Sequence, residues 1–186
     1  GSFDSLNPLI VKGVAAAGMR DYVFESLMAR AYDEPFSLYG LLAETVEMPD
    51  DRSWVEFTLR HGAAFSDGKP VTVDDVLFSH ALLRDHGRPN HRTYYSKVNK
   101  ARKTGPRSVR LTFDAGGDRE MPLIMGLMPV LPKHAFDAET FEQTTLKPLV
   151  GSGPYVVAKV DPGKQVIYRR NPDYWGAKLA VSAGQN

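Results

Sequence analysis

Two segments of the chain alternate strictly between apolar and polar residues. In residues 54–60 the apolar Val55, Phe57 and Leu59 alternate with polar side chains, and residues 109–114 repeat the pattern. Because successive side chains of a strand point to opposite faces, this alternation predicts two half-buried strands of an antiparallel sheet with one solvent-facing side. Other elements must cover the apolar face, so we expect helices packed against it.

Helix signals occur on both sides of the first predicted strand. Thr72 can cap a first turn that contains Asp74 and Asp75, and Gly87 with Pro89 ends the helix by about Arg88. Its predicted inward stripe consists of Val73, Val76, Leu77, His80 and Ala81, with His80 interpreted as a hydrogen-bonded core histidine rather than a ligand. An earlier helix is expected over residues 19–31, where Met19, Tyr22, Val23 and Leu27 fall at helical spacing.

The last ordered unit predicted from the sequence is a hairpin. Residues 155–160 and 165–169 have strand character, and Pro162-Gly163 between them suits a type II turn. Pro132 suits the first position of a short helix. Strands and helices without βαβ regularity predict an α+β fold with mixed, largely antiparallel sheets and packed helices.

Composition narrows the class of protein. The chain has 186 residues, 42% of them hydrophobic and 24% charged, which is typical of one folded globular body. Its net charge is +1 and it has no cysteine, so neither a global field for nucleic acid nor a thiolate metal site is expected. No stretch is apolar enough to predict a membrane-spanning helix.

Local charge is less even than the total. Between residues 84 and 110 only Asp85 is acidic, whereas the basic residues are Arg84, Arg88, Arg92, Lys97, Lys100, Arg102, Lys103, Arg107 and Arg110. Two interpretations stay open: a solvated face, or a docking face for a polyanion whose binding would weaken with salt. Nucleic acid is not predicted as a partner, because aromatic residues for base stacking are sparse here.

The sequence offers no catalytic constellation. Gly151-Ser152-Gly153 lacks the glycines two residues either side of serine that a hydrolase elbow needs, and a tight turn explains it better. His86 and His91 have no recognised metal-ligand spacing, and no phosphate-binding glycine loop occurs. We therefore predict a protein that is not an enzyme, with no cofactor and no metal.

Three stretches together resemble solute-binding protein family 5, the receptors of ABC transporters for oligopeptides, dipeptides, nickel and related ligands. They are residues 22–27 followed by 41–46, residues 57–76 with their strand, Asp-Gly turn and capped helix, and residues 151–155 followed by Asn171-Pro172-Asp173-Tyr174-Trp175-Gly176. Thr45-Val46 stand where the family commonly carries a tryptophan. Residues 3–8 and 128–134 look closest to the Yej-type branch, which takes up oligopeptides and peptide-like antibiotics.

The resemblance implies a fold and a function. Residues 1–186 would form a single truncated lobe, lobe one of a two-lobed periplasmic-binding-protein type II fold, with residues 20–120 as a subdomain inserted between 1–19 and 121–186. The function implied is the substrate-binding component of an ABC transporter that captures oligopeptides or peptide-like solutes in the periplasm. The alternatives are a receptor of the same class for nickel, sugar or opine-like ligands, or a basic protein-interaction module. No charged-then-apolar leader follows Gly1-Ser2, so we expect that an export signal has been removed.

The resemblance also implies site residues and partners. Ligand contacts are expected from Phe3, Asp4, Ser5, Asn7, Arg20, Tyr22, Gly151, Ser152, Gly153 and Tyr155. The competing interpretation is that Asn7 and Tyr22 only cap and pack, and that both glycines serve turn geometry alone. Expected partners are a peptide or peptide-like ligand, the permease subunits of the transporter, a second lobe of the same protein, and another copy paired through an exposed sheet edge.

Overall fold

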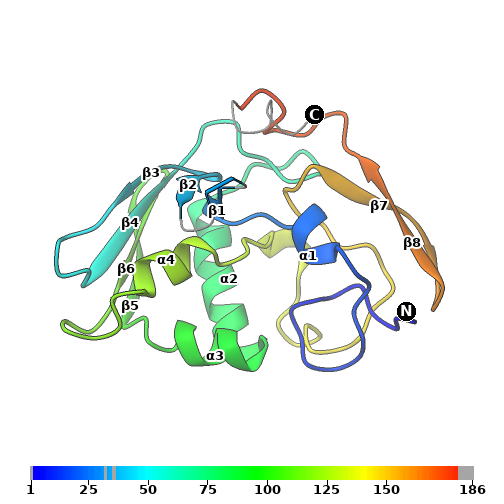
Figure 1. The fold of residues 1–186 in the computed structure, drawn as a ribbon, viewed down its shortest axis with the longest axis horizontal. Helices are drawn as coiled ribbons and strands as arrows, with labels where there is room; N and C mark the ends of the chain where they lie inside the picture. Colours follow the sequence, from blue (N-terminus) through cyan, green and yellow to red (C-terminus); the bar gives the residue numbers. More distant parts are fainter. Residues whose placement is uncertain (1, 32, 35–36, 180–186) are drawn as a thin grey trace.

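Four strands form the largest sheet of the protein. The computed structural model describes residues 2–31, 33–34 and 37–179, and places β3 (Ala43–Glu47), β4 (Trp54–Leu59), β6 (Ser108–Thr112) and β5 (Lys100–Gly105) side by side in that order, all antiparallel (Figure 1). The two strands predicted from alternation are β4 and β6, with Phe57 directly opposite Val109. Val55, Phe57 and Leu59 are fully buried, so one face of this sheet is the core face.

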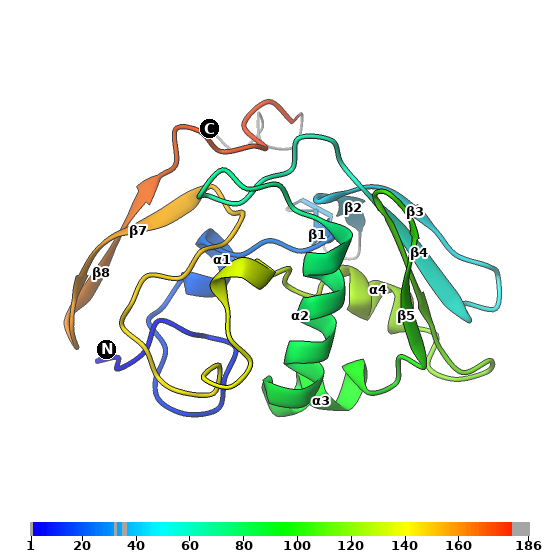
Figure 2. The ribbon, with the colours of Figure 1, turned by 180° about the vertical axis from the view of Figure 1, so that it is seen from behind.

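Helix α2 (Val73–His86) covers this sheet, contacting β5 and β6 (Figure 2). Thr72 caps it as predicted: its side chain accepts a hydrogen bond from the Asp75 backbone N–H, and the Asp75 carboxylate accepts one from the Thr72 N–H at 2.8 Å. Gly87 ends the helix, and α3 (Pro89–Tyr95) follows at once. The cap satisfies backbone donors that the first turn of a helix leaves free.

The buried face of α2 differs from the predicted stripe. Leu77 and Ala81 are only half-buried, whereas the buried side chains include Asp75, Ser79 and Leu83. Asp75 and Ser79 are polar and so do not belong to the predicted apolar stripe. In the structure the Ser79 hydroxyl accepts a hydrogen bond from the Leu131 N–H at 2.8 Å, and the Asp75 carboxylate accepts one from the Lys133 N–H at 2.9 Å. Buried polar side chains on α2 therefore hold the segment that leads to η1 (Lys133–Ala135).

The cap gives a first testable prediction. Thr72→Ala should lower the free energy of unfolding by about 1 kcal/mol, because the Asp75 N–H loses its acceptor. Urea denaturation followed by circular dichroism measures it. Thr104→Ala in β5 is the control: Thr104 is exposed and its side chain makes no hydrogen bond within the described part of the chain, so a loss as large as that of Thr72→Ala would contradict the prediction.

The helix predicted over residues 19–31 is wrong beyond its first turn. Helix α1 spans only Met19–Tyr22, and β1 (Met28–Arg30) pairs with β2 (Leu38–Gly40). The backbone from 23 to 27 bonds distant segments instead of itself: the carbonyls of Val23, Glu25 and Leu27 accept from Gly153, Val130 and Leu41 respectively. Residues 23–28 are all buried, and tertiary contacts on every side replaced the helical ladder.

The predicted hairpin is confirmed as β7 (Tyr155–Asp161) and β8 (Gln165–Arg170), with Gly163 at φ +74° in the turn. It lies at the opposite end of the molecule from the four-stranded sheet, with α1 and α2 between them (Figures 1 and 2). The Tyr168 hydroxyl donates to the Ala17 carbonyl at 2.6 Å, so the hairpin is hydrogen-bonded to the segment that leads into α1. Short helix α4 (Met121–Gly126) precedes the Pro-rich segment.

These elements are the α+β fold predicted, with helices packed on antiparallel sheets. His80 is the core histidine expected: it is buried, and its Nε2 lies 2.9 Å from the Tyr95 carbonyl oxygen. Within the described residues no helix has the length and apolarity to cross a bilayer. The inserted subdomain at residues 20–120 remains a prediction, although the large sheet, α2 and α3 all fall inside that range.

Candidate functional site

A cavity of about 510 Å³ opens between α1, the β1–β2 pair and the start of β7. Its walls combine apolar surface with an unusual number of charged and phenolic side chains. The lining residues are Arg20, Asp21, Phe24, Glu25, Ser26, Ala29, Arg30, Tyr39, Leu41, Leu127, Pro154, Tyr155, Arg170 and Tyr174.

Glu25 joins three separate segments of the cavity wall. Its Oε1 accepts hydrogen bonds from the Ser152 hydroxyl at 3.0 Å and from the Trp175 indole N–H at 2.8 Å. Its Oε2 accepts one from the Tyr174 hydroxyl. The Gly-Ser-Gly turn and the Tyr-Trp-Gly segment, 20 residues apart in the sequence, therefore meet on one buried carboxylate.

Burial dominates the electrostatics of this carboxylate. Removal from water raises the pKa of Glu25 to about 7, although the hydrogen bonds from Tyr174, Trp175 and Ser152 act in the opposite direction. The side chain thus exchanges a proton near neutral pH. Tyr39, across the cavity, has its pKa raised by burial and by the charge of Glu25, so it stays a hydroxyl donor.

The two glycines of the turn are required by close backbone approach. A Cβ on Gly151 would lie 2.0 Å from the Val23 carbonyl oxygen, and one on Gly153 would lie 2.4 Å from that of Tyr22. The same proximity lets the Gly153 N–H donate to the Val23 carbonyl at 2.9 Å. Glycine at both positions brings Ser152, which is buried, within reach of Glu25.

Arg20 anchors the opposite wall. Its guanidinium donates to the carbonyl oxygens of Phe24 and Leu127, each at 3.2 Å. Burial lowers the pKa of this group from its ordinary value. Arg20 therefore holds the backbone at Phe24, next to Glu25, and at Leu127, and these two hydrogen bonds use two of its five N–H groups.

Six of the ten predicted site residues lie together at this cavity. Arg20 and Tyr155 line it, and Ser152 bonds Glu25 between Gly151 and Gly153. The Tyr22 ring packs against Tyr155 and Tyr168, each at 5.2 Å between ring centroids.

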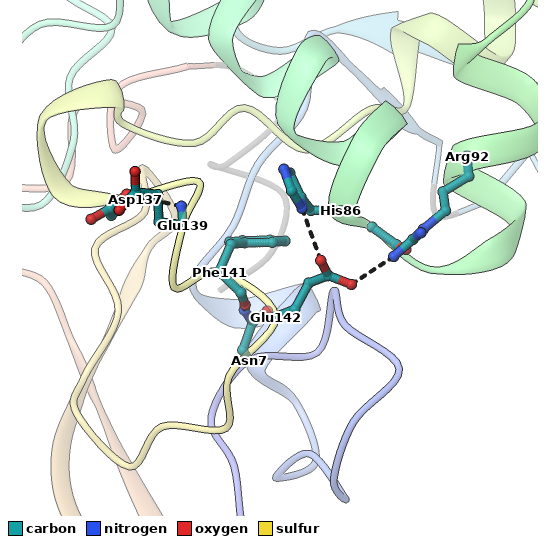
Figure 3. Close-up of polar contacts among 8 residues, drawn as sticks. Asn7, His86, Arg92, Asp137, Glu139, Phe141 and Glu142 are labelled. Carbon is teal, nitrogen blue, oxygen red and sulfur yellow. Dashed lines mark hydrogen bonds and ion pairs between the residues drawn. The ribbon is translucent and has the colours of Figure 1, made fainter.

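The other four predicted residues lie in the N-terminal loop, and none of them lines the cavity at Glu25. Asp4 accepts from the Val14 N–H at 2.6 Å, while Phe3, Ser5 and Asn7 are buried. Asn7 donates to the Phe141 carbonyl (Figure 3). It also borders a second cavity of about 530 Å³ in the loop of residues 134–150. The side chains of Asp4 and Asn7 thus form hydrogen bonds with neighbouring loop backbone.

Sequence reasoning missed the residue at the centre of the site. Glu25 has no predicted role beyond its place in the helix expected over residues 19–31, and Tyr174 and Trp175 are predicted only as part of a family motif. A signal was present in the sequence: Glu25 is the one acid in the apolar run of residues 22–29. A lone acid in such a run indicates a buried carboxylate that needs partners.

Four of the nine basic residues in the segment of residues 84–110 form ion pairs with acids from elsewhere in the described part of the chain. Glu142 lies between His86 and Arg92, at 2.9 and 2.8 Å (Figure 3). The other ion pairs are Arg84–Asp85, Lys97–Asp118, Arg107–Glu44 and Arg110–Glu56. Across the described residues, Lys100, Arg102 and Lys103 on edge strand β5 have no ion pair, where like charges disfavour edge-to-edge pairing.

His86 and His91 each contact protein side chains that do not form a metal site. His86 contacts Glu142, and the His91 ring stacks on Tyr95 at 5.2 Å. Burial lowers the pKa of His91 to about 4. The described residues contain no group of three or more His, Cys, Asp or Glu side chains placed to hold a metal ion.

Comparison with known families identifies the architecture. The model of the bacterial extracellular solute-binding proteins, family 5, matches residues 37–183. This chain belongs to that family. The membership accounts for the joint occurrence of the Asp-Gly turn with its capped helix, the Gly-Ser-Gly turn and the Tyr-Trp-Gly segment, as the sequence resemblance predicted.

Relatives of this family 5 chain carry names of binding proteins. A binding protein of Brucella melitensis is 52% identical over the whole chain, and the peptidoglycan-binding protein YepA of Agrobacterium fabrum is 50% identical over 99% of it. YejA of Agrobacterium fabrum, named as a peptide-binding protein, is 42% identical over the whole chain. The chain spans about a third of the length of each, namely 32%, 31% and 31%.

Solved structures show the same fold. A periplasmic oligopeptide-binding protein of Thermotoga maritima, solved with mannohexaose bound, has a TM-score of 0.72 and 25% identity over 89% of this chain and 31% of its own. The oligopeptide-binding protein AppA of Bacillus subtilis, solved with a nonapeptide, has a TM-score of 0.74 and 21% identity over 94% of this chain and 35% of its own. The second likeness concerns the fold alone.

Proposed function

We propose that this chain is one lobe of a two-lobed extracellular receptor that captures oligopeptides or peptide-like solutes for import by an ABC transporter. The observation that carries the proposal is the cavity at Glu25, whose walls are built by the sequence motifs typical of the family. Family membership and the peptide-binding name of a 42% identical relative support the ligand class. The receptor needs no catalytic group for this task.

Within the proposed site the residues divide by role. Arg20 and Tyr155 line the cavity and are proposed ligand contacts, with Tyr22 supporting Tyr155 from behind. Gly151, Ser152 and Gly153 are proposed as the frame that holds Glu25. Phe3, Asp4, Ser5 and Asn7 would act by fixing the N-terminal loop.

Capture by such receptors requires closure of two lobes around the ligand, and the closed form then docks on the permease subunits. A cavity open on one lobe supplies half of the contacts, so the chain alone should bind weakly. Peptides offer an extended backbone whose carbonyls and amides can bond wall groups with little dependence on side chains. A periplasmic location belongs to the proposal in the same way, and so does a second copy paired at a sheet edge other than the basic strand β5.

A second ligand is favoured by one observation. YepA, 50% identical to this chain, is named for peptidoglycan binding, and peptidoglycan contains short peptides joined to sugars. A peptidoglycan fragment is therefore the alternative to a free oligopeptide.

Calorimetric titration tests the proposal. The longer protein that contains this chain, and the 186-residue chain alone, are each titrated with a mixed oligopeptide library and with soluble peptidoglycan fragments. We expect binding by the longer protein, with an affinity at least tenfold weaker or absent for the chain alone. If neither ligand class binds the longer protein, the peptide-receptor proposal is wrong.

A further inference from the structure

The cavity at Glu25 contains more hydrogen-bond donors than free acceptors. Three arginines line it, Arg20, Arg30 and Arg170, against two acids, Asp21 and Glu25. Both oxygens of Glu25 already accept hydrogen bonds from Ser152, Trp175 and Tyr174. Asp21, exposed at the rim, is left as the acidic acceptor facing a ligand.

Arg30 is the cation best placed to meet a ligand. It is the last residue of β1, its side chain is exposed, and it has no ion pair or hydrogen bond within the described ranges. Arg20, by contrast, already donates two of its N–H groups to backbone carbonyls. Arg30 therefore keeps its full planar set of N–H donors, which matches the two oxygens of a carboxylate.

Phenol groups add further donors to the cavity that Arg30 lines. Tyr39 lies on β2, directly opposite Ala29 of β1, and Ala29 lines the same cavity. Tyr39 and Tyr155 also line it, and their hydroxyls make no hydrogen bond among the residues that the structure describes. A guanidinium and two hydroxyls in the wall of one cavity favour a ligand group that carries negative charge and several acceptor oxygens.

We propose that this lobe is the anion-recognising half of the receptor: Arg30, with Tyr39 and Tyr155, binds a carboxylate of the captured ligand, so that peptides with acidic side chains are preferred over their neutral amide counterparts. The inference rests on the proposed function and specifies its ligand class. It assigns a binding role to Arg30, which belongs neither to the sequence motifs of the family nor to the hydrogen-bond network of Glu25.

Matched peptides test the preference. The longer protein is titrated by calorimetry with Ala-Glu-Ala-Glu-Ala and with Ala-Gln-Ala-Gln-Ala, which have equal length and nearly equal size. We expect the acidic peptide to bind at least tenfold more tightly, the size of one charge-assisted hydrogen-bonded contact, and the advantage to shrink with added salt. Arg30→Gln should abolish the advantage, so that the acidic and the amide peptide bind this variant with affinities within twofold of each other.

Arg102→Gln is the matched control, since Arg102 is an unpaired arginine on β5 and does not line the cavity. This variant should keep the full preference, and a loss equal to that of Arg30→Gln would show a long-range charge effect and overturn the assignment to Arg30. Equal binding of the two peptides by the unmodified protein would overturn the inference while leaving the receptor function standing. Binding of neither peptide, nor of the mixed library, would instead count against the receptor function itself.

Discussion

Gly151→Ala should destabilise the protein by about 3 kcal/mol, which lowers the midpoint of thermal unfolding by about 10 °C for a chain of this size. The added Cβ would lie 2.0 Å from the Val23 carbonyl oxygen and 3.0 Å from the Phe24 ring, and neither atom is the end of a flexible side chain. The turn must move away, which weakens the bonds from Ser66 to Gly151 and from Gly153 to Val23. Differential scanning calorimetry measures the loss.

Gly105→Ala provides the comparison. At Gly105 in β5 a Cβ would first meet the Ser108 hydroxyl at 3.5 Å, an ordinary contact, so its stability should change by less than about 1 kcal/mol. Equal destabilisation by the two substitutions would mean that the loss reflects glycine replacement in general and would contradict the close-approach argument.

Elements set by local signals were predictable from the sequence. The alternation of β4 and β6, the Thr72 cap of α2 and the Pro-Gly turn of the β7–β8 hairpin each act within a few residues, and all five elements occur as predicted. In each case the residues that specify the conformation also lie in it. Periodicity and turn chemistry are therefore sufficient there.

Residues 19–31 show where local signals fail. Their apolar spacing fits a helix, but residues 23–28 are all buried, and carbonyls of this stretch accept hydrogen bonds from residues 41, 130 and 153. When every residue of an apolar stretch is buried, no polar face alternates with the apolar one. The spacing of the apolar residues then cannot distinguish a helix from an extended core segment.

Single residues and turns of the candidate site were predictable from the sequence, but the hydrogen bonds that bring them together were not. The Gly-Ser-Gly turn, Arg20 and Tyr155 were identified from the sequence, yet the carboxylate between them was not, because its donors Ser152, Tyr174 and Trp175 lie 127 or more residues away along the chain. Only the fold shows that these groups meet. Conversely, the basic run of residues 84–110 suggested a charged face, and distant acids such as Glu142 neutralise part of it.

Glu25→Gln should remove a pH dependence from the stability of the protein. The native pKa of Glu25 is about 7, above its ordinary value of 4.5, so between these pH values the native state keeps a proton that the unfolded state has released. The free energy of unfolding therefore falls as pH rises from 4.5 to 7, by about 3 kcal/mol from this group, and is constant above. Glutamine carries no charge, so the variant should equal the unmodified protein near pH 4 and exceed it most at pH 8.

Glutamine can also replace the protonated side chain without loss of hydrogen bonds. Its Oε1 can accept from Ser152 and Trp175, and its Nε2 can donate to the Tyr174 hydroxyl oxygen, as a protonated Glu25 would. Urea denaturation of both proteins from pH 4 to 8 gives the difference in unfolding free energy, with Glu139→Gln, an exposed carboxylate, as the charge control. A flat difference for Glu25→Gln, or an equal rise for Glu139→Gln, would contradict the prediction, because the expected pH dependence comes from the loss of water around the Glu25 carboxylate on folding.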